Sequence, residues 1–506
     1  MKKQDKSKRS LPYIALGLTL FLILEIYYYS SPGISMGFDD SIYAYSTIDT
    51  EILKTISWGV VSYGFKAFTL PFYILLDHSI FVTKYVCLLS LAIISVAIFL
   101  TLKMYRSSFG GILAILLYSF NPLTFANTIR YVPDPFVTMC DSVGILVAVY
   151  AATTRKKWLF SLSGLITASG LFFGNQAAIS IIAFVLFVPF LWYSLDSQKS
   201  RRKWNNYAFL KEFSKIFAWL FLGILILVSI YFLIQGVEYN DFLYSVANEV
   251  KYYEVNMLNR YPNYIFYSYA LYPFNRDFQL GSFIDPYHNL GILPAIFIAV
   301  LAYSLYTSIG KHNKLIPYLA FFVTFLLYVM FGSESASFYI PIQNLSRVLM
   351  PVVLVMSIGT SIAISEIKNQ TLKLIIGLGI ILLYLVYFNN PYHAIISLYN
   401  SPPTSTNWLI TQSVIKNFGM LNLSNFTFYE NYSNIGNIAC MSFNSPPSIC
   451  IGIPMPKISC NQNKIFVVYI GTQHDICTGN GGFYYYNSTY NYSVYMNPPI
   501  AKNLGN

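Results

Sequence analysis

Residues 80–102 read IFVTKYVCLLSLAIISVAIFLTL and are followed at once by the basic residues Lys103 and Arg106. At a rise of about 1.5 Å per residue, a helix of this length crosses the roughly 30 Å hydrocarbon core of a bilayer. The stretch therefore predicts a transmembrane helix with a basic flank.

Apolar stretches of similar length recur along the chain. Of its 506 residues, 55% are hydrophobic and only 10% are charged, whereas soluble domains carry roughly 25% charged residues. The pattern predicts a polytopic α-helical membrane protein with about eleven transmembrane helices. The predicted spans are 11–30, 80–102, 109–127, 134–152, 158–174, 177–195, 215–235, 289–309, 315–332, 347–365 and 374–389.

The basic residues predict how these spans are oriented. If the N-terminus is cytoplasmic, the inner segments are 1–10, 103–108, 153–157, 196–215, 310–314 and 366–373. They hold twenty of the 32 Lys and Arg residues in less than a fifth of the chain, as the positive-inside rule requires. The net charge of +11 therefore reflects orientation in the cell membrane and does not indicate a nucleic-acid partner. With an odd number of spans, the C-terminus is predicted to be extracytoplasmic.

Two domains follow from this map. Residues 1–390 form the transmembrane domain, with long outer loops at 31–79 and 236–288. Within the first loop, the interrupted apolar stretch Trp58 to Leu76 predicts an interfacial helix on the outer face. Residues 391–506 predict a small extracytoplasmic α/β or mostly β domain, in which Lys464 to Ile470 is typical of a strand. The tyrosine-rich stretch Tyr484 to Tyr495 is expected to be an irregular edge or tail.

The six cysteines fall into two groups. Cys87 and Cys140 lie inside apolar runs and are expected to be ordinary buried residues. Cys440, Cys450, Cys460 and Cys477 lie in the polar C-terminal domain. Four cysteines in an external segment predict two disulfides, with three possible pairings. A zinc site is the alternative, but no CxxC motif occurs.

An acidic pair, Asp39 and Asp40, follows the first predicted span. One carboxylate could act as a general base on an acceptor hydroxyl, while the other orients a cation or a sugar hydroxyl. The alternative is structural, since either residue could cap a helix over Ser41 to Lys54.

The short outer loop before residue 134 holds Arg130, whose guanidinium suits phosphate binding. Asp134 lies between two prolines and is expected to be a helix N-cap with Pro135 at the first helical position. Asp141 follows seven residues later on the same helix face, and an acid at membrane depth is usually functional. Arg347 opens a late span, four residues before Pro351, and could bind a lipid phosphate or extend to the interface.

No Walker loop, GxGxxG, HExxH or GxSxG motif occurs. Their absence argues against ATP-driven transport and against standard soluble-enzyme chemistry.

The order of these features resembles the GT-C class of membrane glycosyltransferases. An uncleaved first span, an outer acidic pair, an interfacial helix, an R-x-x-x-D loop (Arg130, Asp134) and a late Arg with a nearby Pro (Arg347, Pro351) carry the resemblance over residues 1–390. The most similar group is the dolichyl-phosphate-mannose–protein mannosyltransferases and aminoarabinose transferases.

The resemblance implies transfer of a sugar from a polyprenyl-phosphate donor to a glycan, lipid or protein acceptor at the outer face. It implies that Asp39, with Asp40 beside it, carries the catalytic carboxylate, that Arg130 and Arg347 hold the donor phosphate, and that Asp134 is the acid before span four. Many relatives have a Lys after span five, where this chain has Gly174-Asn175-Gln176. The WWDYG motif of oligosaccharyltransferases is missing, which argues against en bloc glycan transfer to Asn.

Two questions stay open from the sequence. A divalent metal could assist the reaction, although no metal ligands are assigned. The alternative function is a non-catalytic membrane transporter, or a scaffold that displays the C-terminal domain.

Overall fold

A computed structural model describes most of the transmembrane domain and the core of the C-terminal domain. The described residues are 29, 63–75, 82–196, 206–253, 292–307, 314–331, 346–399, 410, 413–414, 417–418, 427–430, 449–451, 465–470, 483–489 and 492–497. The first predicted span apart from Tyr29, the acidic pair Asp39–Asp40 and most of the loop 236–288 lie outside them.

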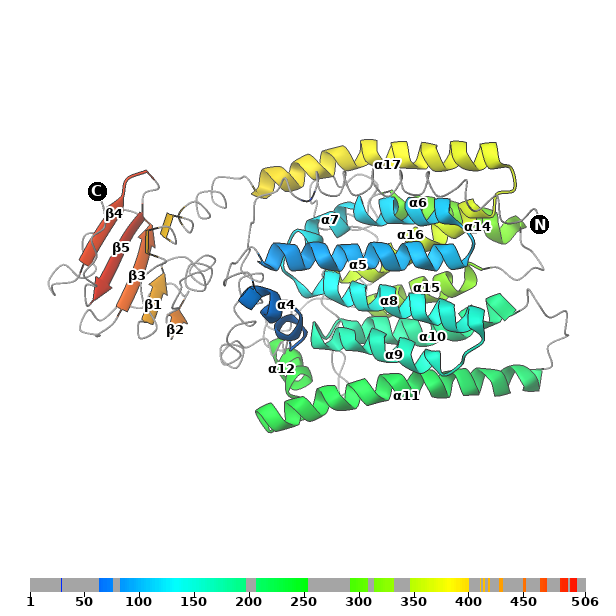
Figure 1. Cartoon of the computed structure of the whole chain (residues 1–506), viewed down its shortest axis with the longest axis horizontal. Coiled ribbons are helices and arrows are strands. Elements are labelled where there is room, and N and C mark those ends of the chain that lie inside the picture. The colour runs from blue at the N-terminus through cyan, green and yellow to red at the C-terminus, as the bar shows by residue number, and fades with distance from the viewer. Residues whose placement is uncertain are drawn as a thin grey trace.

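The described N-terminal part is a bundle of helices (Figure 1). Its elements are α4 (Tyr63–Leu75), α5 (Val82–Met104), α6 (Ser108–Ser119), α7 (Pro122–Thr128), α8 (Pro133–Thr154), α9 (Leu159–Ala168), the 3-10 helix η1 (Ser169–Phe172), α10 (Ala177–Asp196), α11 (Asn206–Tyr239), α12 (Tyr244–Tyr253), α14 (Leu293–Thr307), α15 (Ile316–Phe331), the 3-10 helix η5 (Ser346–Leu349), α16 (Met350–Ser365) and α17 (Gln370–Tyr399).

Each predicted span after the first coincides with one of these helices or with a pair of them. Five of the helices in the described part are long and apolar enough to cross a membrane, or six if the bent pair α6–α7 is one span. The other apolar helices, in α9–η1, α14, α15 and α16, are shorter. A multi-pass helical membrane protein is thus supported, and the count of eleven stays a prediction.

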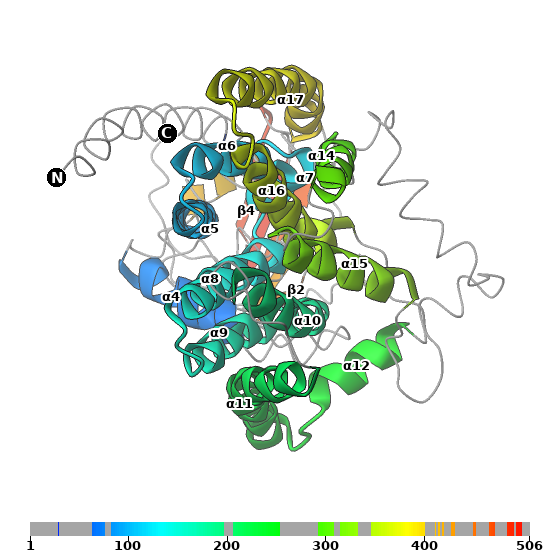
Figure 2. The same ribbon diagram turned by 90° about the vertical axis from the view of Figure 1, so that its right-hand side faces the viewer.

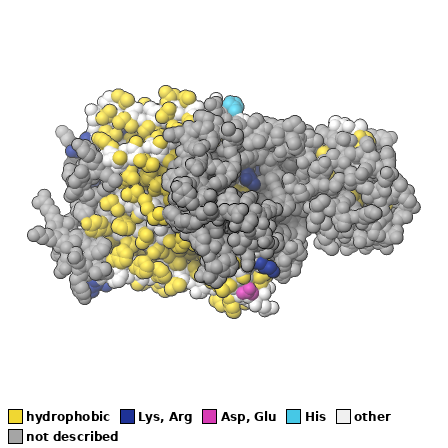
Figure 3. Space-filling model, turned by 180° about the vertical axis from the view of Figure 1, so that it is seen from behind, with side chains coloured by type: hydrophobic (Ala, Val, Ile, Leu, Met, Phe, Trp, Pro, Cys, Tyr) yellow, Lys and Arg dark blue, Asp and Glu magenta, His cyan; other side chains and the backbone are white. Residues whose placement is uncertain are grey.

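The most deeply buried helices of the bundle are α7, α8 and α16. In the end-on view, α17 lies at one edge of the bundle and α11 at the opposite edge (Figure 2). Large aliphatic side chains on the outer faces of these two helices are exposed, including Leu225, Leu233, Leu378 and Leu382. Hydrophobic side chains also cover much of the described surface seen from behind (Figure 3). Such a surface requires a lipid solvent.

Local sequence explains where the helices begin. Ser107 caps α6 by accepting a hydrogen bond from the backbone N–H of Gly110 (2.9 Å), and Asn121 caps α7 through the N–H of Leu123 (3.0 Å). Pro122 follows as the first residue of α7, where its missing N–H costs nothing. Because the cap interrupts the helical backbone, α6 and α7 meet at 67°.

The C-terminal domain contains a five-stranded mixed sheet of order β2-β1-β3-β5-β4. Its strands are β1 (Thr427–Glu430), β2 (Ile449–Ile451), β3 (Ile465–Ile470), β4 (Phe483–Asn487) and β5 (Tyr492–Asn497). β1 pairs in parallel with β2 and β3, whereas β5 is antiparallel to β3 and β4. The strand predicted at Lys464 to Ile470 is confirmed as β3.

The prediction of irregular chain over Tyr484 to Tyr495 is wrong. This stretch forms the hairpin β4–β5, and β5 lies inside the sheet. Alternate residues of β5 are apolar or aromatic, and Tyr492 and Val494 are fully buried. Aromatic residues favour strands, and the low-complexity composition concealed that pattern.

The cysteines are only partly described. Cys87 and Cys140 are buried and free, as predicted. Cys450 lies in β2, whereas Cys440, Cys460 and Cys477 lie outside the described residues, so the disulfides stay a prediction.

Candidate functional site at the start of helix α8

The start of α8 carries Asp134, but not at the predicted N-cap position. The N-cap is Val132, whose extended backbone (φ −124°, ψ 162°) precedes Pro133 as the first helical residue. A proline is favoured there because its φ is already helical and its missing N–H would have no partner. Asp134 is therefore the second residue of the helix, and the prediction of an Asp134 cap is wrong.

Asp134 is a buried carboxyl at the positive end of a helix. Its residue is only 2% exposed. The side chain of Gln176 approaches it from the α9–α10 turn, with Nε2 3.5 Å from Oδ1. The Thr138 hydroxyl donates to the Asp134 carbonyl at 2.8 Å. The unpaired N–H groups of a first helical turn favour an anion, so this environment suits a fixed carboxylate.

Arg130 is half-buried in the loop that joins α7 to α8. The loop backbone is held in place, since the Arg130 N–H donates to the Asn127 carbonyl (3.2 Å) and its carbonyl accepts from the Cys87 thiol (3.3 Å). Cys87 thus has a structural role beyond filling space. A guanidinium on a fixed loop can bind an oxyanion bidentately.

The structure places the backbone of Arg347 at the same end of the bundle. Arg347 lies in η5, which contacts α7, and α7 ends two residues before Arg130. The side chain of Arg347 is outside the described part of the structure, as are Asp39 and Asp40. Of the five predicted site residues, the structure therefore brings three backbones to one end.

Helix α4 packs over the residues that flank Asp134. The hydroxyls of Thr69 and Tyr131 lie 2.6 Å apart, and the ring of Phe68 meets Phe136 edge-on at 5.9 Å. Phe136 in turn stacks on Phe173 with ring centroids 5.3 Å apart. The helix predicted over Trp58 to Leu76 is confirmed for Tyr63–Leu75, and it covers this end with aromatic side chains.

A polar network beside Asp134 was not predicted from the sequence. Tyr231 of α11 donates to Asn175 Oδ1 at 3.0 Å and lies 3.1 Å from the Ser245 hydroxyl of α12. Gln235 accepts from the backbone N–H of Ser245 at 3.0 Å. The one available signal was the polar break Gly174-Asn175-Gln176, because polar residues between two apolar runs indicate a helix end.

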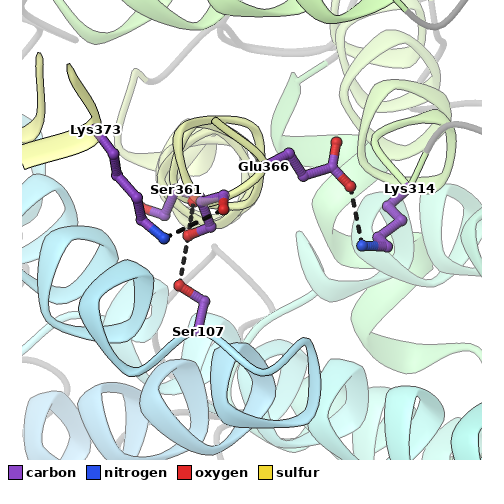
Figure 4. Close-up of polar contacts among 6 residues, drawn as sticks. Ser107, Lys314, Ser361, Glu366 and Lys373 are labelled. Carbon is purple, nitrogen blue, oxygen red and sulfur yellow. Dashed lines mark hydrogen bonds and ion pairs between the residues drawn. The ribbon is translucent and has the colours of Figure 1, made fainter. Parts of the chain in front are cut away.

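The opposite end of the bundle is held by a separate set of polar contacts (Figure 4). Lys314 pairs with Glu366 at 2.9 Å, and Lys373 donates to the carbonyl of Ser365 at 3.2 Å. The Ser107 hydroxyl bonds to that of Ser365. These contacts hold α6, α15 and α17 against the last turn of α16.

The described ranges contain no group of three or more His, Cys, Asp or Glu side chains that could hold a metal ion. Asp39 and Asp40 are not among those residues, so a divalent metal stays a prediction.

Comparisons with known proteins concern the fold. No protein-family model matches the sequence, and no curated protein matches it. The structure is similar to ArnT from Cupriavidus metallidurans in the apo state (TM-score 0.55, 10% identity, covering 96% of this chain and 98% of ArnT).

The form of ArnT bound to undecaprenyl phosphate gives a TM-score of 0.54 at 10% identity, covering 98% of this chain and 99% of that one. An oligosaccharyltransferase from Archaeoglobus fulgidus, in complex with Zn and sulfate, gives 0.49 at 11% identity, covering 90% of this chain and 69% of that one. The predicted resemblance is confirmed at the level of the fold: this chain has the fold of the GT-C membrane glycosyltransferase ArnT.

Proposed function

We propose that this protein is a glycosyltransferase that moves a sugar from a polyprenyl-phosphate donor to a hydroxyl-bearing acceptor at the outer membrane face. The observation that carries the proposal is the similarity to ArnT over almost the whole of both chains. ArnT was solved with undecaprenyl phosphate bound, the kind of lipid that would remain after such a donor has lost its sugar.

The proposed reaction is a direct displacement at the anomeric carbon. The acceptor oxygen forms a bond to that carbon while the bond to the phosphate oxygen breaks, and the sugar configuration inverts. Asp39, or Asp40 beside it, takes the hydroxyl proton. The departing lipid phosphate carries the negative charge, and Arg130 and Arg347 stabilise it. The phosphate is a good leaving group, so no strong general acid is required.

Asp134 is proposed to position the reacting groups and not to accept the proton itself. Its burial, its place in the first turn of α8 and its neighbour Gln176 support a fixed anion. A fixed anion two residues beyond the end of the Arg130 loop can hold a basic side chain or a sugar hydroxyl in one orientation.

The C-terminal domain is proposed to select the acceptor. Its sheet lies beyond the end of the bundle at which α4 is found (Figure 1), which is the end that carries Asp134. Two disulfides among Cys440, Cys450, Cys460 and Cys477 would stabilise this domain outside the cell. A glycan, lipid or protein acceptor would reach the donor from this side.

One observation favours the second candidate, a membrane transporter. The helix pair α6–α7 is bent by 67°, and broken helices are frequent in transporters. The similarity to a transferase over the full length of the chain outweighs this feature, and the assay below separates the two functions.

The test is transfer of a radiolabelled sugar in proteoliposomes from an undecaprenyl- or dolichyl-phosphate donor, with release of lipid phosphate as a second readout. Wild type should release lipid phosphate, and Asp39→Asn or Asp40→Asn should lower the rate by ~10²–10⁴-fold. Asp134→Asn should lower it by up to ~100-fold through misplacement of the reacting groups. Glu366→Gln, at the other end of the bundle, is the matched control and should leave the rate unchanged.

Two outcomes would contradict the proposal. Undiminished transfer in both Asp39→Asn and Asp40→Asn would exclude the acidic pair as the base. No transfer by folded wild type across a panel of hexose and aminopentose donors, together with uptake of an intact lipid-linked sugar, would favour the transporter.

A further inference from the structure

A second buried acid, Asp141, lies two helical turns beyond Asp134 on α8. Asp141 is fully buried, with 0% exposure. Neither of its carboxyl oxygens has a hydrogen-bond partner of good geometry among the described residues, and no Lys or Arg of that part forms an ion pair with it. A carboxylate in such a place is strongly disfavoured unless something compensates its charge.

The groups around Asp141 are hydroxyls that also lack partners. Ser180 of α10 lies beside its carboxyl. Tyr118, in the last turn of α6, is close enough to the Asp141 carboxyl for an electrostatic interaction. It also lies next to Thr124 of α7. The hydroxyls of Tyr118, Thr124 and Ser180 are fully buried and, within the described ranges, make no hydrogen bond of good geometry, although Tyr118 also lies next to Thr138. Four oxygen-bearing side chains from four helices thus converge in the interior.

This cluster lies at the bend between α6 and α7. The carbonyl end of α6 carries a partial negative charge, which adds to that of Asp141. At the opposing N-terminus of α7, Pro122 has no N–H, and Asn121 accepts from the N–H groups of Leu123 (3.0 Å, side chain) and Phe125 (2.9 Å, carbonyl). The backbone carbonyls of Tyr118 and Ser119 accept hydrogen bonds from the Asn121 N–H (3.2 Å) and the Tyr29 hydroxyl (2.5 Å). The oxygen atoms without a hydrogen bond of good geometry at the bend are therefore those of the side chains. In other membrane proteins, half-helix ends of this kind coordinate Na⁺ or protons.

We propose that Asp141, Ser180, Tyr118 and Thr124 form a binding site for one monovalent metal cation. Oxygen ligands suit hard cations. One carboxylate balances one positive charge, whereas divalent sites usually gather several carboxylates. The described part of the chain offers no such group. A bound cation would join α6, α7, α8 and α10 beneath the candidate transferase site, and it would do so without taking part in sugar transfer.

The test is binding of ²²Na⁺ to the purified full-length protein in detergent, combined with thermal unfolding in NaCl or choline chloride at equal ionic strength. Wild type should bind ²²Na⁺ saturably, and its Tm should rise with NaCl but not with choline chloride. Asp141→Asn should abolish both effects, and Ser180→Ala should weaken binding by ~10-fold. Ser194→Ala is the matched control on the same helix, because the buried Ser194 hydroxyl bonds to its own helix at the Leu191 carbonyl (3.0 Å).

The wild-type measurement decides the proposal even if Asp141→Asn fails to fold. An equal response to KCl and NaCl would support a monovalent site without selectivity. Absence of saturable ²²Na⁺ binding with the same Tm in both salts would overturn the proposal and leave Asp141 as a neutral carboxyl. A Tm that responds to CaCl₂ or MgCl₂ alone would also overturn it.

Discussion

At the scale of single residues, the sequence predicted which charged residues gather at the candidate site, but not their exact positions relative to the helix start. Arg130 and Asp134 were predicted as neighbours in an outer loop, and the structure places them at one helix end. The helix nevertheless begins at Pro133 and not after Asp134, because either of two flanking prolines could have taken the first position. The polar break at Gly174-Asn175-Gln176 indicated a helix end, but the contacts of Gln176 and Tyr231 could not be predicted, since they depend on which helix ends meet in space.

Arg130 offers a test of the phosphate site at this scale. Arg130→Ala should lower kcat/KM for the lipid donor by roughly 10-fold. This loss corresponds to the weaker hydrogen bonds made by charged groups, because the Arg130 side chain is only half-buried. Arg130→Lys should restore part of the loss, since it keeps the charge but not the bidentate geometry. The measurement is initial transfer rate against donor concentration. Arg106→Ala, an exposed arginine at the opposite end, is the control, and an equal loss in both variants would count against a phosphate contact at Arg130.

At the scale of elements, hydropathy located helices at ten of the predicted spans but did not reveal the bend, and the number of spans stays a prediction. Residues 109–127 read as one apolar run, yet Asn121-Pro122 divides it into α6 and α7. Each half buries its apolar side chains, so hydrophobicity alone cannot distinguish a bent pair from one straight span. The strands β4 and β5 were not predicted, because the low-complexity composition of Tyr484 to Tyr495 suggested irregular chain. The alternation of side chains along a strand was the better guide there.

The contact between α9 and α11 depends on glycine. A Cβ added at Gly223 would lie 1.8 Å from the Ser161 carbonyl oxygen, and one at Gly164 would lie 2.6 Å from that of Leu220. Close approach through small residues is a common way for helices to associate in lipid. Gly223→Ala should therefore destabilise the protein by about 1–3 kcal/mol, as overpacking does.

The matched control is Gly379→Ala on α17, where an added Cβ meets nothing within 4 Å. That variant should be neutral or slightly stabilising, because alanine favours a helix more than glycine does. Thermal unfolding in detergent would compare the two. Equal Tm values for Gly223→Ala and Gly379→Ala would show that α9 and α11 are not in the close contact described here.

At the scale of the whole molecule, the sequence predicted which kind of protein this is, and the structure adds how its two ends differ. One end carries Arg130, Asp134 and α4, with the sheet beyond it (Figure 1). The other carries the Lys314–Glu366 pair and Arg155 over the ring of Trp192 at 4.5 Å. The charge pattern of the sequence predicts that this second end faces the cytoplasm. If that prediction holds, the positive-inside rule accounts for the basic residues of the second end, and the proposed transfer belongs at the first end.

Sidedness can be tested with single cysteines introduced at exposed positions. Asp241→Cys lies near the end with the candidate site and Lys368→Cys at the opposite end, and both positions are exposed. A membrane-impermeant maleimide applied to intact cells should label Asp241→Cys but label Lys368→Cys only after permeabilisation. Peptide-level mass spectrometry separates these sites from the natural cysteines, of which Cys87 and Cys140 are buried. The reverse labelling pattern would place Asp134 on the cytoplasmic side, where the transfer proposed at the outer face could not occur.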